Sequence, residues 1–119
     1  MIENLNILKK IKDDFISIIC SKEKLYLNKR CIICITREGR RTKYVCINSE
    51  LLVYDSLNNI EKILPDNYVR CSNGCIVNMY FCKKYKDSKL YMRNGRIVDV
   101  SRTFKRRVEE YIAKMHRIS

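Results

Sequence analysis

Cysteine is the residue of this sequence with the widest chemistry, because a thiolate can bind a metal, act as a nucleophile or form a disulfide. The chain has seven cysteines. Cys31-x-x-Cys34 and Cys71-x3-Cys75 loosely resemble the paired ligands of a zinc ribbon. The first pair, however, lies in an apolar run typical of a strand, where side chains three apart point to opposite faces. Structural zinc is therefore a minor hypothesis, and we expect no metal.

Catalysis and redox regulation have weak support. His116 is the only histidine and has no obvious carboxylate or cysteine partner. The sequence has no glycine-rich phosphate loop and no acidic cluster for magnesium, so we expect neither an enzyme nor a cofactor. Cys71 follows Arg70, which could favour a thiolate and a redox role, although a packed thiol is the simpler interpretation. The odd number of cysteines argues against a disulfide scaffold.

Charge is the strongest functional signal. Lys and Arg number 25, Asp and Glu number 13, and the net charge is +12. Residues 29–45 hold six basic residues and one acidic residue, and residues 83–119 hold twelve basic and four acidic residues. The remaining segments are close to neutral. Such clustering indicates a polyanionic partner, with nucleic acid as the first candidate.

Length and composition limit the class of protein. A chain of 119 residues with 46% hydrophobic residues has room for one packed domain. No apolar run is long enough to span a membrane, and the N-terminus lacks the pattern of a secretion signal. We therefore expect a cytoplasmic protein. Residues 1–14 form an N-terminal extension with apolar residues about three apart, which favours a short helix.

The elements that position the basic segments are mostly strands. Alternating or β-branched apolar runs predict strands at 15–20, 24–27, 30–37, 42–48, 51–54, 68–71, 75–82, 89–93 and 96–100. Glycines at 39 and 95 predict tight turns. A short helix follows Asp55 or Ser56 and ends before Pro65. A C-terminal helix, capped by Ser101, carries an apolar stripe from Phe104 to Met115.

Residues 42–108 resemble the LytTR-type DNA-binding domain of the LytR/AgrA response regulators. The resemblance rests on Ser56-Leu57 at the start of the helix, on Tyr68-Val69-Arg70-Cys71-Ser72-Asn73-Gly74-Cys75-Ile76-Val77-Asn78, and on Val100-Ser101-Arg102. Their order and spacing agree with the family pattern. Two positions depart from it, because Ser72 replaces the usual histidine and Gly74 the usual serine.

The resemblance implies a mostly β fold over residues 15–119, with antiparallel sheets, a short central helix and a C-terminal helix. It also implies that loops read DNA. We expect Arg40, Asn73 and Arg102 to contact bases, Ser72 to lie at the contact turn, and Asn78 to be structural. The residues expected at phosphates are Arg37, Arg41, Lys43, Arg70 and Lys105.

The resulting hypothesis is a sequence-specific transcriptional regulator that binds double-stranded DNA in the major groove. About 14 residues precede the first predicted strand, which leaves no room for a receiver domain, so we expect a stand-alone form. The resemblance implies paired direct repeats as targets, a homodimer on DNA, and control by a membrane-bound or soluble inhibitor protein. The alternatives are a non-catalytic adaptor or anti-regulator that binds a protein, and a zinc-containing RNA-binding module.

Overall fold

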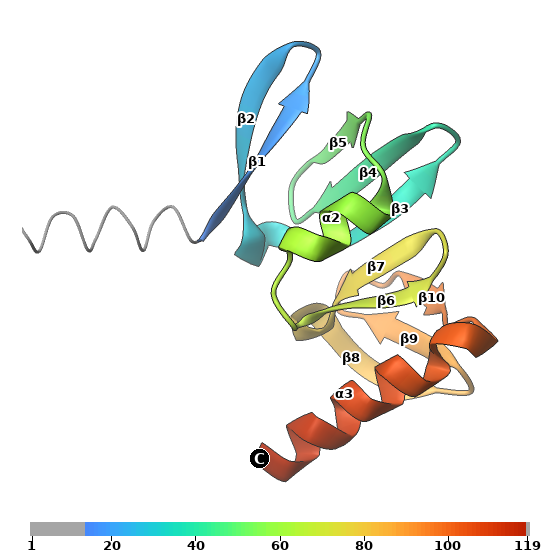
Figure 1. The fold of residues 1–119 in the computed structure, drawn as a ribbon. Coiled ribbons are helices and arrows are strands. Elements are labelled where there is room, and N and C mark those ends of the chain that lie inside the picture. Colours follow the sequence, from blue (N-terminus) through green and yellow to red (C-terminus); the bar gives the residue numbers. More distant parts are fainter. Residues whose placement is uncertain (1–13, 119) are drawn as a thin grey trace, which may run out of the picture.

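The computed structural model describes residues 14–118 and arranges ten strands in three antiparallel sheets (Figure 1). The largest sheet has the order β5-β4-β3-β7-β6, a second sheet has the order β10-β9-β8, and β1 and β2 form a separate hairpin. The strands are β1 (Phe15–Cys20), β2 (Glu23–Asn28), β3 (Ile32–Glu38), β4 (Arg41–Cys46), β5 (Glu50–Val53), β6 (Tyr68–Ser72), β7 (Cys75–Asn78), β8 (Cys82–Lys86), β9 (Lys89–Met92) and β10 (Ile97–Asp99). The mostly β fold class is thus confirmed.

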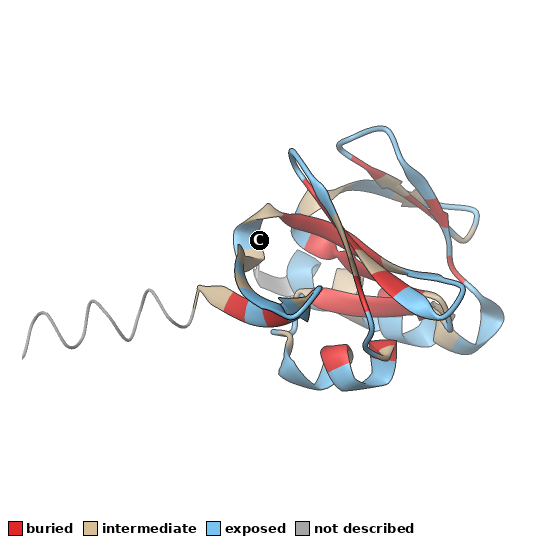
Figure 2. Cartoon of the chain, turned by 90° about the horizontal axis from the view of Figure 1, so that it is seen from above, coloured by how far each residue is buried: buried red, intermediate tan, exposed pale blue. Residues whose placement is uncertain are grey.

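The five-stranded sheet buries both of its faces. On one face, Ile35 and Ile76 pack against β1 and the helix α2 (Leu57–Ile63). On the other face, Val77 packs against β9, β10 and the helix α3 (Lys105–Ile118). Figure 2 shows the buried residues gathered on the strands and the turns exposed to solvent. The turns therefore project from a scaffold that is packed on both sides.

A β-bulge explains how the central strand β3 supplies both cores. Its pairing with β4 shifts register between Ile32 and Cys34. One extra residue in a strand changes which face the following side chains take. Ile32 and Ile35 consequently lie in one core, whereas Ile33 and Cys34 lie in the other. This irregularity also places the Cys31-x-x-Cys34 pair outside simple strand alternation.

The turns and the central helix follow their predicted chemistry. Gly39 and Gly95 have φ angles of +65° and +89°, in the region that favours glycine, and they close the β3–β4 and β9–β10 hairpins. The Ser56 hydroxyl caps α2 by accepting a hydrogen bond from the Asn59 amide at 3.1 Å. The helix ends at Ile63, and Leu64 is extended before Pro65.

The C-terminal helix begins later than predicted. The chain first forms a 3-10 helix, η3 (Arg102–Phe104), and the Ser101 side chain makes no capping hydrogen bond. The backbone itself closes this turn, because the Phe104 amide donates to the Ser101 carbonyl at 2.9 Å. The predicted stripe is buried at Val108, half-buried at Tyr111 and Ile112, and 43% exposed at Met115.

The single strand predicted over 75–82 is wrong, because Asn78 interrupts it. A 3-10 helix, η2 (Met79–Phe81), separates β7 from β8, and the Asn78 side-chain oxygen accepts a hydrogen bond from the Tyr80 amide at 3.0 Å. Asparagine can offer the backbone this local partner in place of the strand ladder. Asn28 does the same at the start of the predicted strand 30–37, where it caps the 3-10 helix η1 (Lys29–Cys31).

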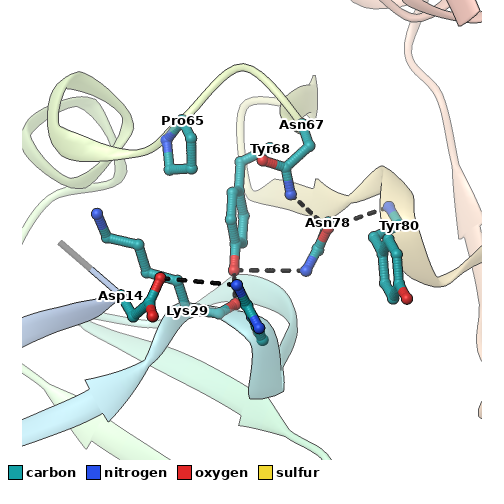
Figure 3. A pocket seen from close by; sticks show the side chains of 8 residues that line it. Asp14, Lys29, Pro65, Asn67, Tyr68, Asn78 and Tyr80 are labelled. Carbon is teal, nitrogen blue, oxygen red and sulfur yellow. Dashed lines mark hydrogen bonds and ion pairs between the residues drawn. The ribbon is translucent and has the colours of Figure 1, made fainter. Parts of the chain in front are cut away.

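Asn78 also ties the β6–β7 pair to the start of β3, and Figure 3 shows its contacts with the side chains of Asn67 and Tyr68. It is 2% exposed, and its amide nitrogen donates to the Ile32 carbonyl at 2.8 Å. Its oxygen accepts a second bond, from the Asn67 side chain at 2.8 Å. Nearby, the Tyr68 hydroxyl donates to the Lys29 carbonyl. The expectation that Asn78 is structural agrees with this network.

The expected N-terminal helix and the expected absence of a membrane-spanning segment concern the whole chain, whereas the structure describes residues 14–118. The N-terminal extension, predicted as helical, lies almost entirely outside the described residues, which begin at Asp14. Within the described part, no helix is long and apolar enough to cross a membrane.

Replacing Asn78 by alanine tests this network. The change leaves buried polar groups without partners, so we expect the free energy of unfolding to fall by about 2–3 kcal/mol. Urea unfolding measures it. Asn48→Ala is the matched control, because Asn48 is exposed and its replacement should change stability by less than about 0.5 kcal/mol. An effect of Asn78→Ala as small as that of the control would contradict the structural role.

Alkylation of the cysteines tests whether Cys71 has a redox role. Cys34 and Cys71 are both 0% exposed and Cys75 is 8% exposed. Burial raises the pKa of Cys34 to about 12, and interaction with the Cys71 thiol together with burial raises the pKa of Cys75. Because all three thiols are buried away from the reagent, we expect iodoacetamide at pH 8 to spare these three residues until urea is added. The half-buried Cys20 and Cys31 should react in the native protein. Labelling of native Cys71 as fast as Cys31, read by mass spectrometry, would instead support a redox role.

Candidate nucleic-acid interface

Three segments that carry predicted contact residues meet at one edge of the molecule. They are the β3–β4 hairpin turn, the β6–β7 turn and η3, which lie on the same side of Figure 1. The backbone joins them directly. The Arg37 amide donates to the Gly74 carbonyl at 2.8 Å, and the Ser101 amide donates to the Cys71 carbonyl at 2.9 Å. The edge is therefore one connected surface, built from parts of the chain that are far apart in sequence.

The β6–β7 turn is held from inside by Arg70. The Arg70 guanidinium donates from Nε to the Ser72 carbonyl at 2.7 Å and from Nη2 to the Asn73 carbonyl at 2.6 Å. The Ser72 hydroxyl accepts a bond from the Gly74 amide at 3.2 Å. With both turn carbonyls directed inward, the Asn73 side chain is left exposed. A β-bulge between Arg70 and Ser72 produces this geometry.

Arg70 itself is buried, and its guanidinium makes four hydrogen bonds. Its side chain is 7% exposed, and Nη1 donates to Asn58 Oδ1 at 2.9 Å and to Glu61 Oε2 at 3.0 Å. A buried cation needs such a countercharge and hydrogen-bond acceptors. Its donors are committed to these partners and to the turn, so little of the side chain remains for a phosphate. The structure places Arg70 beneath the surface rather than on it.

The β3–β4 hairpin presents a row of arginines. Arg40 is exposed at the turn and makes no hydrogen bond, ion pair or ring contact within residues 14–118. Arg37 curls back, donating from Nε to the Gly39 carbonyl at 3.1 Å. The Arg41 guanidinium lies 5.8 Å from the centre of the Tyr54 ring, a cation–π distance. The hairpin thus leaves Arg40 most available to a ligand.

Lys43 is less available than the arginines. Its ammonium lies 3.1 Å from a Glu50 carboxylate oxygen and 3.5 Å from one of Glu38. The hydrogen bond with Glu50, followed by attraction to Glu38, raises the pKa of Lys43 above its usual value. The lysine stays charged, but two carboxylates already offset that charge locally.

The third segment carries Arg102 and Lys105. Arg102 is exposed and has no partner in the described part of the chain, and Lys105 is half-buried at the start of α3. Phe104 anchors this segment to the interior, because its ring lies 5.8 Å from the Arg70 guanidinium. Arg102 is therefore presented from a short helix that is fixed at both of its ends.

Sequence reasoning did not identify Arg96. A shallow groove of about 350 Å³ runs between the β6–β7 turn and β10, and Arg96 lines it beside Ser72 and Ser101. The Asn94-Gly95 turn in the sequence predicted that Arg96 would begin a strand. Which surface this strand would face depends on how the second sheet packs under the first, and no local pattern encodes that.

The charged side chains at this edge are mostly cationic. Arg37, Arg40, Arg41, Arg96 and Arg102 are all exposed. Asp99, which also lines the groove, pairs with Lys89 at 2.5 Å. Exposed lysines also occur on β8, at Lys83, Lys84 and Lys86. Within residues 14–118, no group of three or more metal-ligating side chains comes together. The arrangement can bind a polyanion and can present amide and guanidinium groups to it.

Comparison with known proteins identifies the fold. The family model of the LytTr DNA-binding domain matches residues 22–113. Among solved structures, the chain is similar to the LytTr DNA-binding domain of a Bacillus cereus protein, with 22% sequence identity and a TM-score of 0.72. That match covers 83% of this chain and 96% of the other. No curated protein matches the chain. The matched range contains all three segments of the candidate interface, and the chain belongs to the LytTR family of DNA-binding domains.

Proposed function

We propose that this protein is a transcriptional regulator that recognises a specific double-stranded DNA sequence through its turns. The observation that supports this most strongly is the connected edge, where exposed Arg40, Asn73 and Arg102 project from three segments joined by backbone hydrogen bonds. Arginine bonds guanine and asparagine bonds adenine through paired contacts in the major groove. A fixed spacing between such side chains is what sequence reading requires.

The surrounding residues have supporting roles in this proposal. Arg37, Arg41 and Lys105 contact phosphates, Lys43 adds a weaker contribution, and Ser72 lies where the DNA backbone approaches the turn. Arg70 shapes the reading turn instead of contacting a phosphate, because its guanidinium is buried and engaged. We also propose that the protein is cytoplasmic. We further propose that two copies occupy paired direct repeats and that an inhibitor protein controls them.

Selection from random duplexes tests the function itself. The purified protein is mixed with the duplex pool at near-physiological salt and with excess non-specific competitor. The competitor is needed because a net charge of +12 attracts any duplex. Enrichment of a short repeated motif supports a sequence-specific regulator. Binding without enrichment of any motif contradicts it and favours an adaptor or anti-regulator that uses the same fold to bind a protein.

Removing a base-reading side chain should relax specificity. We expect Asn73→Ala and Arg102→Ala each to weaken binding to the selected motif by about 1–3 kcal/mol, and to change binding to random duplex much less. Fluorescence anisotropy on both duplexes measures the difference. Lys114→Ala, at an exposed position in the C-terminal part of α3, is the control for loss of one positive charge. Equal weakening on both duplexes would assign Arg102 to phosphate contact.

Removing a phosphate contact should act on all sequences alike. We expect Arg41→Ala to weaken binding to the motif and to random duplex by similar factors. The slope of log affinity against log salt should become shallower by about 0.9, the value for one released counterion. Titrations at four or five salt concentrations give this slope. An unchanged slope would show that Arg41 serves to pack on Tyr54 rather than to bind DNA.

A further inference from the structure

We infer that Glu61, on the central helix α2, is a positioning residue that sets the distance between two of the DNA-reading segments. The inference rests on the proposed function and extends it to a residue outside the interface edge. Each carboxylate oxygen of Glu61 serves a different arginine. Oε2 accepts a hydrogen bond from Arg70 Nη1 at 3.0 Å, and Oε1 accepts one from Arg107 Nη1 at 3.1 Å.

The first connection reaches the β6–β7 turn. Glu61 is the carboxylate that pairs with Arg70 within the described chain, and Arg70 in turn holds the carbonyls of Ser72 and Asn73. Arg70 is buried, so its position depends on the countercharge at Glu61. A shift of the guanidinium would move both turn carbonyls, and Asn73 with them.

The second connection reaches η3. Glu61 orients Arg107, whose guanidinium lies 5.2 Å from the centre of the Phe104 ring. The same ring lies 5.8 Å from the guanidinium of Arg70. Phe104 ends the helix that begins with Arg102, so both connections from Glu61 converge on the residue that anchors Arg102. One carboxylate therefore joins the segment of Asn73 to the segment of Arg102.

The negative charge of Glu61 makes its positioning role measurable, because neutralising it should affect specific and non-specific DNA affinity differently. Glu61 is an acidic residue in a protein of net charge +12, so its neutralisation should slightly strengthen attraction to any duplex. If Glu61 fixes the spacing of Asn73 and Arg102, the same change should weaken binding to the selected motif. Replacing a residue that only stabilises the fold would not lower the affinity for the motif while raising the affinity for random duplex.

The test compares Glu61→Gln with Glu23→Gln. Both remove one negative charge, and Glu23 is exposed at the start of β2 with no ion pair in the described residues. We expect Glu61→Gln to lower affinity for the selected motif about tenfold, while affinity for random duplex stays equal or rises. Glu23→Gln should leave the ratio of the two affinities unchanged. Equal ratios in both variants would overturn the inference.

Two substitutions that conserve charge test the connection from Glu61 to η3 by itself. Arg107→Lys keeps the positive charge but loses the planar group that faces Phe104, whereas Arg106→Lys makes the same change at an exposed residue paired with Glu110. We expect Arg107→Lys to lower the ratio of specific to non-specific affinity and Arg106→Lys to leave it unchanged. Failure of Arg107→Lys to change the ratio would overturn the inference, because η3 would then be positioned without Glu61.

Hydrogen exchange in the free protein separates this inference from the proposed function. Glu61→Gln should accelerate exchange of the Gly74 amide in the turn and of the Ser101 and Phe104 amides near η3, with no change in the β1–β2 hairpin. Acceleration at only one of the two segments, or at neither, overturns the inference. Absence of any motif for the unaltered protein would refute the proposed function, while the exchange rates would still decide whether Glu61 orders both segments.

Discussion

The guanidinium of Arg70 connects a central helix, an edge strand and a surface turn. It donates to the side chains of Asn58 and Glu61 on α2 and to the carbonyls of Ser72 and Asn73. Burial of this cation is stable because each partner is an oxygen acceptor and one carries a negative charge. The same contacts leave the Asn73 side chain facing solvent. A buried polar network, rather than the apolar core alone, therefore gives the candidate interface its shape.

The proposed mode of DNA recognition differs from that of proteins that insert a helix into DNA. The apolar stripe of α3 packs against the core at Val108, which commits that face of the helix to the fold. The side chains that we propose to read DNA lie instead on two turns and on the short helix η3, and such short surface segments need external support to hold a fixed geometry. Here the support comes from the backbone bonds of Arg37 to Gly74 and of Ser101 to Cys71.

Local chemistry in the sequence was sufficient to predict the hairpin turns, the central helix and most strands. The local conformation is determined by groups close by in the sequence. They are the glycines of the β3–β4 and β9–β10 turns, the hydroxyl of Ser56 and the ring of Pro65. The failures involve side chains whose roles depend on distant partners or on local competition. Asn78 bonds a neighbouring amide and thereby ends a strand whose other residues are apolar or aromatic.

At the candidate site, too, features set by neighbouring residues could be predicted and features set by distant partners could not. The clustering of arginines identified the surface, and the turn residues indicated Asn73. The sequence could not show that Arg70 is buried, because its partners come from a helix nine and twelve residues earlier in the chain. Nor could it place Arg96 beside Ser72, since those residues meet only when the two sheets pack. The resemblance to the family added the choice of Arg40 and Arg102 as expected base contacts, which the clustering of charge did not make by itself.

We propose above all that DNA binds at the edge formed by the three segments. An NMR titration of the isotope-labelled protein with a selected duplex tests it most directly, because amide shifts report the contacted surface. We expect the largest changes in residues 37–43, 72–74 and 101–105, with small changes in the β1–β2 hairpin. Changes centred on the exposed lysines of β8, with residues 72–74 unaffected, would contradict it.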